Sequence, residues 1–273
     1  MTTDRHENGW LRLPDGHKGR YPFSLSVPSY VYPADILPNV DILRHHVDAV
    51  ELLFFEGTPP WALPDTAVVD ALCRYRETDG LAYNVHLPTD VSLTSQRDPD
   101  HALAVYARMI DRIKPVAPET WTLHLDAPTD MDRLSLASWQ KQAIRQLEAL
   151  SRKTGLSLCD ISLETLMYPV EWLVPVCDRS GASVCLDLGH LMLSGQDVAA
   201  VWSALGHQSA IVHWHGVSGG KDHLPLSVFD DEWMNRFVSW FRDYAGILSI
   251  EVFQAAGLGR SLDCLVAAWN NVR

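Results

Sequence analysis

The chain alternates short apolar runs with longer segments of helical periodicity, and this alternation restricts its fold more than any other feature. Runs of strand length that are apolar almost throughout are typical of parallel strands covered by helices on both faces. The pattern therefore predicts an α/β protein with a parallel sheet. Eight such runs occur, at residues 23–27, 49–55, 81–87, 121–125, 161–166, 182–188, 210–215 and 247–253.

The segments between these runs carry the signals that begin and end helices. In residues 64–80, Asp65 or Thr66 is a candidate N-cap and Gly80 is a candidate stop. Strand–helix units repeated in this way, eight in all, favour a single (β/α)8 TIM barrel. Comparable helical patterns cover residues 98–115, 136–155 and 229–246.

Length and composition indicate one domain. At 273 residues the chain has the size of one such barrel, and its composition does not break along its length. We expect the barrel to span residues 21–273, with residues 1–20 as an N-terminal tail or a plug of the barrel. The alternative is an open doubly wound sheet, which usually carries a glycine-rich phosphate loop after an early strand. Residues 26–39 do not form such a loop, so we favour the closed barrel.

The charge and the cysteines limit the partners and the compartment. A net charge of −12 argues against a polynucleotide, because proteins that grip phosphate backbones usually present basic surfaces. No apolar run approaches the roughly 18 residues that cross a bilayer, and the N-terminus lacks an apolar signal core. The five cysteines form no CxxC pair, which favours reduced thiols. We expect a cytoplasmic protein with a small-molecule substrate and neither nucleic acid nor membrane as partner; its oligomeric state stays open.

Histidines and carboxylates gather where the proposed strands end. The carboxyl ends of barrel strands converge on one mouth, where active sites form. One such residue alone is usually just hydrogen-bonded, but Glu164 and Glu251 interrupt apolar strands, where an unpaired charge is costly. Metal coordination would remove that cost. The set comprises His86, His124, Asp126, Glu164, Asp187, His190, His213, His215, Asp222, His223 and Glu251.

Spacing sharpens the metal hypothesis. Asp187 and His190 are three apart in a strand-to-helix turn, where both side chains can face one centre. His213 and His215 are two apart on a strand and point to the same side, so one can bind metal while the other touches substrate. Since one ion needs three or four protein ligands, the set suffices for two or three zinc, manganese or iron ions. Lys221 either places a positive charge on a phosphate or lies in solvent.

The array of His86, His124, Glu164, Asp187-Leu-Gly-His190, His213, Asp222-His223 and Glu251 resembles the endonuclease IV and xylose isomerase-like barrel superfamily, also called AP endonuclease 2-like. The resemblance covers residues 23–265. In the endonuclease branch a similar array holds three zinc ions that cleave a phosphodiester. There is one departure: the aspartate and histidine after strand seven of the endonuclease are separated by one residue, whereas Asp222 and His223 are adjacent.

Within that superfamily the chain is most similar to the cobamide-remodelling phosphodiesterases, the CbiR family. The stretches that carry this similarity include SYVYPADILPNV, NVHLPTD, CLDLGHLMLSG and VHWHGVSGGKDHLPL. The resemblance implies hydrolysis of the phosphodiester that joins the lower-ligand nucleoside to the aminopropanol arm of a cobamide. The products would be cobinamide phosphate and the nucleoside, and the corrinoid would be the substrate.

The same resemblance implies roles for the site residues. Glu164 and Glu251 would bridge or anchor metal ions, and the remaining ligand positions would be filled by His86, His124, Asp187, His190 and His213. The residues implied as further ligands or as contacts to the phosphate and leaving group are His215, Asp222 and His223, with Lys221 near the phosphate. The aromatic residues that would pack against a corrin, or simply within the barrel, are Tyr30, Tyr32, Trp61, Tyr168 and Trp214.

Three other functions compete with this interpretation. A sugar isomerase or epimerase needs a single ion, which Glu164, Asp187, His213 and Glu251 would hold without the other histidines. A DNA repair nuclease acting on abasic sites would need a basic groove. A non-enzymatic corrinoid or metal carrier would bind without turnover.

Overall fold

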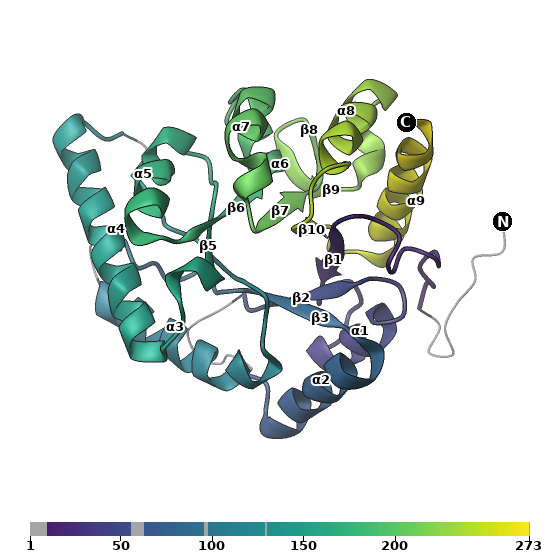
Figure 1. The fold of residues 1–273 in the computed structure, drawn as a ribbon, viewed down its shortest axis with the longest axis horizontal. Helices are drawn as coiled ribbons and strands as arrows, with labels where there is room; N and C mark the ends of the chain where they lie inside the picture. Colours follow the sequence, from purple (N-terminus) through teal and green to yellow (C-terminus); the bar gives the residue numbers. More distant parts are fainter. Residues whose placement is uncertain (1–9, 56–62, 96–97, 129, 273) are drawn as a thin grey trace.

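The computed structural model describes residues 10–55, 63–95, 98–128 and 130–272, and shows eight parallel strands that close into a barrel. Their order around the barrel is β1-β10-β7-β6-β5-β4-β3-β2, with helices packed around the outside (Figure 1). The predicted (β/α)8 barrel is therefore confirmed, and each predicted apolar run coincides with one barrel strand, although β1 extends one residue beyond its run. The strands are β1 (Ser24–Pro28), β2 (Ala49–Leu53), β3 (Ala82–His86), β4 (Trp121–Leu123), β5 (Ile161–Glu164), β6 (Ser183–Asp187), β7 (Ile211–Trp214) and β10 (Ile247–Ile250).

Local signals set most of the helix ends. The Asp65 side chain accepts a hydrogen bond from the N–H of Val68, and Gly80 adopts a left-handed conformation with φ of 63° just after the helix. The prediction that the last of the four helical patterns runs to Gly246 is wrong: that helix ends at Phe241. The helices are α1 (Ile36–Leu43), α2 (Thr66–Asp79), α3 (Pro99–Ile113), α4 (Arg133–Thr154), α5 (Val170–Ser180), α6 (Leu188–Leu193), α7 (Val198–Leu205), α8 (Asp231–Phe241) and α9 (Ala255–Asn271).

The segment after β7 is a hairpin. Strands β8 (Gly216–Ser218) and β9 (Lys221–Leu224) pair antiparallel outside the barrel. Gly219 and Gly220 form the turn with φ of 58° and 74°, a conformation that glycine adopts without strain. The hairpin carries three of the predicted site residues, namely Lys221, Asp222 and His223.

Residues 10–20 run along the outside of the barrel. The Trp10 ring stacks on Tyr32 at 5.1 Å between centroids, and Tyr32 Oη donates a hydrogen bond to the Leu11 carbonyl oxygen. Leu13 is buried, and Lys18 Nζ donates to the Asp79 carbonyl oxygen at the end of α2. In the described range this segment therefore packs against the barrel wall.

The barrel interior changes from apolar to polar towards the site. Cys185, Ile211 and Ile247 form a small buried apolar cluster at the lower end. Above it, hydrogen bonds cross the lumen between strands that are not neighbours. Ser26 Oγ on β1, for example, donates to Asn84 Oδ1 on β3 at 2.8 Å. The metal-ligand candidates at the mouth thus rest on a polar layer rather than on the branched apolar side chains usual in such barrels.

Two expectations about the environment can be compared with the structure. None of the helices in the described ranges has the length and apolar character needed to span a bilayer. All five cysteines lie in described segments and are free thiols, as the sequence predicts.

Candidate metal centre

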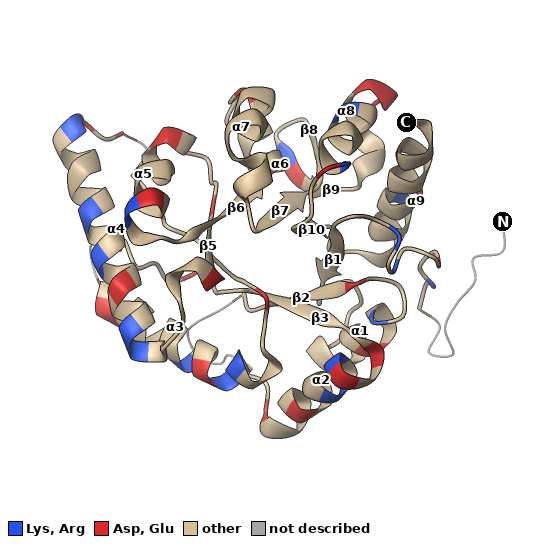
Figure 2. Ribbon diagram, in the orientation of Figure 1, with Lys and Arg blue, Asp and Glu red and all other residues tan. Residues whose placement is uncertain are grey.

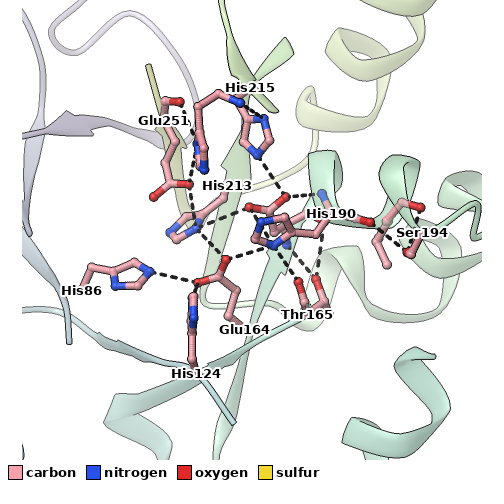
Figure 3. Close-up of polar contacts among 12 residues, drawn as sticks. His86, His124, Glu164, Thr165, His190, Ser194, His213, His215 and Glu251 are labelled. Carbon is pink, nitrogen blue, oxygen red and sulfur yellow. Dashed lines mark hydrogen bonds and ion pairs between the residues drawn. The ribbon is translucent and has the colours of Figure 1, made fainter. Parts of the chain in front are cut away.

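Glu164, the last residue of β5, is the hub of a buried cluster at the mouth of the barrel (Figure 3). Its side chain is 1% exposed. One oxygen, Oε2, lies 3.0 Å from His86 Nε2 and 2.8 Å from His124 Nε2. The other, Oε1, lies 3.3 Å from His190 Nδ1 and 3.6 Å from His213 Nδ1. The two oxygens therefore face two different pairs of imidazoles.

Backbone carbonyls select the tautomers of two of these histidines. His86 Nδ1 lies 2.9 Å from the Leu87 carbonyl oxygen and donates to it, so in the neutral ring Nε2 is the nitrogen with the lone pair that can bind a cation. His190 Nδ1 lies 3.2 Å from the Thr165 carbonyl oxygen. In the neutral ring that contact leaves Nε2 of His190 as the nitrogen able to bind a cation.

His213 is oriented by a carboxylate that the sequence analysis missed. Glu51, in the middle of β2, is fully buried; its Oε1 lies 3.1 Å from His213 Nε2, and its Oε2 accepts from Ser249 Oγ at 2.6 Å. His213 Nδ1 consequently points to the centre, where it lies 3.4 Å from Glu251 Oε2. A carboxylate behind a metal-binding imidazole fixes its tautomer and raises its basicity. The signal was present, because Glu51 interrupts an apolar run just as Glu164 does.

Asp187 joins the centre to helix α6. Its Oδ1 caps the helix by accepting from the His190 N–H at 2.7 Å, and its Oδ2 lies 3.9 Å from His213 Nδ1. His215 Nδ1 accepts from the His223 N–H at 3.0 Å, so in the neutral ring Nε2 carries the proton. That Nε2 lies 3.3 Å from Asp187 Oδ1. His215 therefore orients Asp187 and ties the β8–β9 hairpin to the centre, rather than offering a free lone pair.

Gly189 makes this arrangement possible. A Cβ at this position would lie 2.0 Å from His215 Cε1, so only glycine leaves room for the ring. The Asp-Leu-Gly-His stretch thus supplies two polar residues to the centre and space for a third.

Burial and charge set the pKa values of the carboxylates. Burial would raise the pKa of Glu164, but the neighbouring histidines, His124 first, hold it well below its usual range. Burial would also raise the pKa of Asp187, but the charges of His215 and His190 outweigh burial and lower that pKa to about 2. For Glu251 burial prevails and raises the pKa to about 7.

The histidines respond in the opposite sense. Burial would lower the pKa of His86, but its hydrogen bond with Glu164 raises it to about 9. The pKa of His190 rises to about 10, because Asp187 and Glu164 outweigh its burial. His223 differs: burial and the neighbouring His215 lower its pKa to about 4, which keeps its ring neutral near neutral pH.

Two unsatisfied atoms test whether the cluster suits a cation. Asp187 Oδ2 and His213 Nδ1 are buried, have no hydrogen-bond partner and face the centre; His215 Nε2, beside Asp187 Oδ1, is likewise buried without a hydrogen-bond partner. Ligands about 2.1 Å from a tetrahedral ion stand roughly 3.4 Å from one another, close to the contacts of His213 Nδ1 with Glu251 and Glu164, 3.4 Å and 3.6 Å. The residues therefore fit a divalent cation. Groups whose ligand atoms lie within 4.8 Å of one another include His86 with His124 and Glu164, and Glu164 with Asp187 and His190.

The structure gathers most, but not all, of the residues that the sequence singled out. Lys221 and Asp222 are exposed on the β8–β9 hairpin and do not line the cavity at the centre, and Asp126 is exposed at a neighbouring hollow. The residues brought together are His86, His124, Glu164, Asp187, His190, His213 and Glu251, with His215 and His223 beside them.

The aromatic candidates divide between the mouth and the barrel wall. Trp214 is fully buried against Phe237 and Phe241 of α8, because strand alternation turns it away from the lumen that His213 faces. Tyr30 is 50% exposed at the mouth. Tyr32 and Tyr168 are buried, and Trp61 lies outside the described residues.

A cavity of about 210 Å³ opens onto the centre. In Figure 2 the lysines and arginines lie mainly on the outer helices, and no described lysine or arginine lines this cavity. Its lining consists of Leu53, Phe54, Phe55, His86, Thr89, His124, Glu164, His190, His223, Glu251 and Phe253.

Comparison with known proteins establishes the fold. No protein-family model and no curated protein matches the chain. A D-tagatose 3-epimerase-like protein has 17% identity and a TM-score of 0.71, covering 92% of this chain and 98% of its own. The IOLI protein with a bound zinc atom has 13% identity and a TM-score of 0.70, covering 92% and 99%. A xylose isomerase domain protein from Planctomyces limnophilus has 14% identity and a TM-score of 0.68, covering 94% and 99%. The predicted xylose isomerase-like barrel is confirmed.

Replacing Glu51 with Gln should weaken metal binding while preserving the fold. The amide oxygen of Gln can still accept from His213 Nε2, but it lacks the charge that makes the imidazole basic, so we expect zinc affinity to fall about 10- to 100-fold. Competition with a chromophoric chelator measures the affinity. Glu148→Gln, an exposed carboxylate on α4, is the control. Equal affinities of the two variants would contradict the role of Glu51.

Replacing Gly189 with Ala should disturb the centre through His215. The new methyl group has no space, so we expect a loss of about 1–3 kcal/mol in the free energy of unfolding. Gly259→Ala in α9 is a matched control, because its Cβ would meet no atom closer than 3.8 Å. That control should be neutral or gain up to about 1 kcal/mol. Urea unfolding of both variants measures the two free energies. Similar urea midpoints for the two variants would contradict the predicted clash between the new methyl group and the His215 ring.

Zinc binding should release protons near neutral pH. Without a bound cation, His86 and His190 hold protons below pKa values of about 9 and 10. The charged forms of these two histidines stabilise the fold. Their contribution is complete below the pKa of histidine in the unfolded chain, about 6.5, and is lost as pH rises through 9 to 10. Ligation requires neutral rings, so apparent zinc affinity should increase with pH over the same interval. Calorimetry in buffers of different ionisation enthalpy should detect release of about two protons; none would contradict the assignment.

Proposed function

We propose that the chain is a metal-dependent phosphodiesterase that hydrolyses the nucleotide-loop phosphodiester of cobamides. The observation that carries the proposal is the division of Glu164: Oε2 faces Nε2 of His86 and of His124, while Oε1 faces His213 Nδ1. A carboxylate placed in this way suits a bridge between two cations, and pairs of cations clamp the attacking and leaving oxygens of phosphoesters. Support for a cobamide comes from the sequence resemblance described above.

The chain's own residues would bind and position the reactants. Bound divalent ions supply positive charge to a phosphoester and lower the pKa of water. Glu164, Asp187 and Glu251, with the histidines His86, His124, His190 and His213, would hold the ions. Water would form the new bond to phosphorus as the bond to the nucleoside oxygen breaks, leaving the phosphate on the aminopropanol arm.

His223 presents a nitrogen lone pair at the cavity. It lies at the cavity, keeps its side chain 28% exposed, and has a pKa of about 4, so its ring is neutral. Its Nδ1 lies 3.3 Å from the Glu251 carbonyl oxygen, which assigns the ring proton to Nδ1 and the lone pair to Nε2. His223 would therefore contact the substrate or complete an ion's ligands through Nε2.

A sugar isomerase or epimerase is the second candidate, and the names of the similar structures favour it: an epimerase-like protein and a xylose isomerase domain protein stand among them. The four ligands that one ion would need do converge, since Glu251, Glu164 and Asp187 all approach His213 Nδ1. The lining of the cavity weighs against it. Apart from the ligand candidates, Thr89 is its one polar side chain among the described residues, too few for a polyhydroxylated sugar.

The cavity also bears on the other two alternatives. A nuclease for abasic DNA needs basic side chains along its groove, and the described residues that line the cavity include no lysine or arginine. A carrier that binds only a corrinoid has no need of the unsatisfied ligand atoms at Asp187 and His213. The nuclease and the corrinoid carrier therefore explain less of the site than hydrolysis does. A metal carrier would use those atoms, and it differs from a hydrolase in binding metal without turnover.

Incubating the metal-replete protein with adenosylcobalamin should yield cobinamide phosphate and the lower-ligand nucleoside, separated by chromatography. Glu164→Gln should reduce the rate at least about 1,000-fold, because the variant loses the charge that both ion positions share. Metal content, measured in parallel, should be at least two ions per wild-type chain.

Each competing function predicts a different result. One bound ion with epimerisation of a ketohexose would replace the proposal by the isomerase, and tight corrinoid binding without products would favour the carrier. Glu148→Gln, on the outer surface of α4, is the control for the Glu164 variant and should keep the wild-type rate.

A further inference from the structure

An aromatic wall extends outward from the metal centre along one side of the barrel mouth. Its members are Phe253 after β10, Phe55 after β2 and Tyr30 after β1. The ring centroids of Phe253 and Phe55 are 6.3 Å apart, and those of Phe55 and Tyr30 are 5.1 Å apart, both pairs edge to face. Phe55 and Tyr30 are 49% and 50% exposed, which is costly for large aromatic side chains that serve only to pack.

This wall is continuous with the centre. The Phe253 ring lies 4.8 Å from that of His223, and Phe253 and Phe55 line the same cavity as Glu164 and His190. Beyond them, Tyr30 and Phe253 border an adjoining hollow of about 400 Å³, whose floor includes the stacked Trp10 and Tyr32. A group attached to a phosphoester at the centre would therefore meet aromatic rings on this side.

The opposite rim of the mouth differs in character. There the hollow beside His124 and His190 is edged by Leu166 and by Met167, which is 54% exposed. Tyr168, on the same rim, is 9% exposed and packs against Trp139 and Trp172. Among the described residues, the large exposed aromatic side chains thus lie on the side formed by β1, β2 and β10.

We propose that Tyr30, Phe55 and Phe253 form a subsite for a planar conjugated ring carried by the phosphoester substrate. The inference rests on the proposed function and adds the chemical class of the group next to the scissile phosphate. Aromatic faces bind flat rings by stacking, and removing one such face typically weakens binding by roughly 5- to 100-fold. A saturated group of equal size would touch the same wall without stacking on it.

Phosphonates separate the subsite from the chemistry, because they bind without turnover. Calorimetry on the zinc-loaded protein would compare methyl-, cyclohexyl- and phenylphosphonate. The phenyl compound should bind about ten-fold more tightly than the methyl compound, and more tightly than the cyclohexyl compound. In Phe55→Leu and Tyr30→Leu this phenyl preference should largely disappear, while zinc content and methylphosphonate affinity stay unchanged. Met167→Leu, equally exposed on the opposite rim, is the matched control and should retain the preference.

The outcomes are distinguishable. If all three phosphonates bind but the phenyl preference is absent, or survives in both leucine variants, the subsite is wrong and the phosphodiesterase proposal stands. If no phosphonate binds the zinc-loaded protein, the proposed function is overturned and the subsite with it. Tighter binding of cyclohexyl- than phenylphosphonate would indicate a merely apolar surface and would also overturn the inference.

Discussion

A single buried carboxylate imposes most of the order at the mouth of this barrel. Glu164 is 1% exposed, and an ionised carboxylate so deep in a protein requires compensating charge and hydrogen bonds. The barrel provides them from both sides of β5: His86 and His124 reach one oxygen, His190 and His213 the other. Closure of the sheet makes this possible, because residues far apart in sequence meet only where strand ends converge.

A second set of residues holds these ligands in place. Glu51 fixes His213 from below, and His215 fixes Asp187 from the side of the hairpin. Each contact has a local requirement: Ser249 hydrogen-bonds the far oxygen of Glu51, and Gly189 leaves space for the His215 ring. The polar layer within the barrel is therefore part of the site, since it orients the ligands that a purely apolar interior would leave free to turn.

Periodicity was enough to predict the barrel, and the strand ends were enough to predict which residues would lie together at its mouth. The runs of apolar residues specify buried parallel strands, and alternation along β7 places His213 in the lumen while turning Trp214 toward α8. Glu51 could not be predicted from the strand ends, because it lies in the middle of β2 and orients His213 instead of facing the centre itself. The positions of Asp222 and His223 depend on the hairpin turn and on the left-handed backbone of His223, φ 49°, which no periodicity encodes.

Charge balance supports the proposal that the centre holds more than one cation. Four buried carboxylates, Glu51, Glu164, Asp187 and Glu251, surround the centre, and fully ionised they carry four negative charges. One divalent ion would neutralise half of this negative charge, and protonated histidines would have to neutralise the rest. Two divalent ions would neutralise all of it with the histidines uncharged. The raised pKa values of His86 and His190 mark where positive charge is needed, on opposite sides of Glu164. Because no described lysine or arginine lines the cavity, an anionic phosphodiester would have to be met by the ions themselves, whereas a neutral sugar would not need the second one.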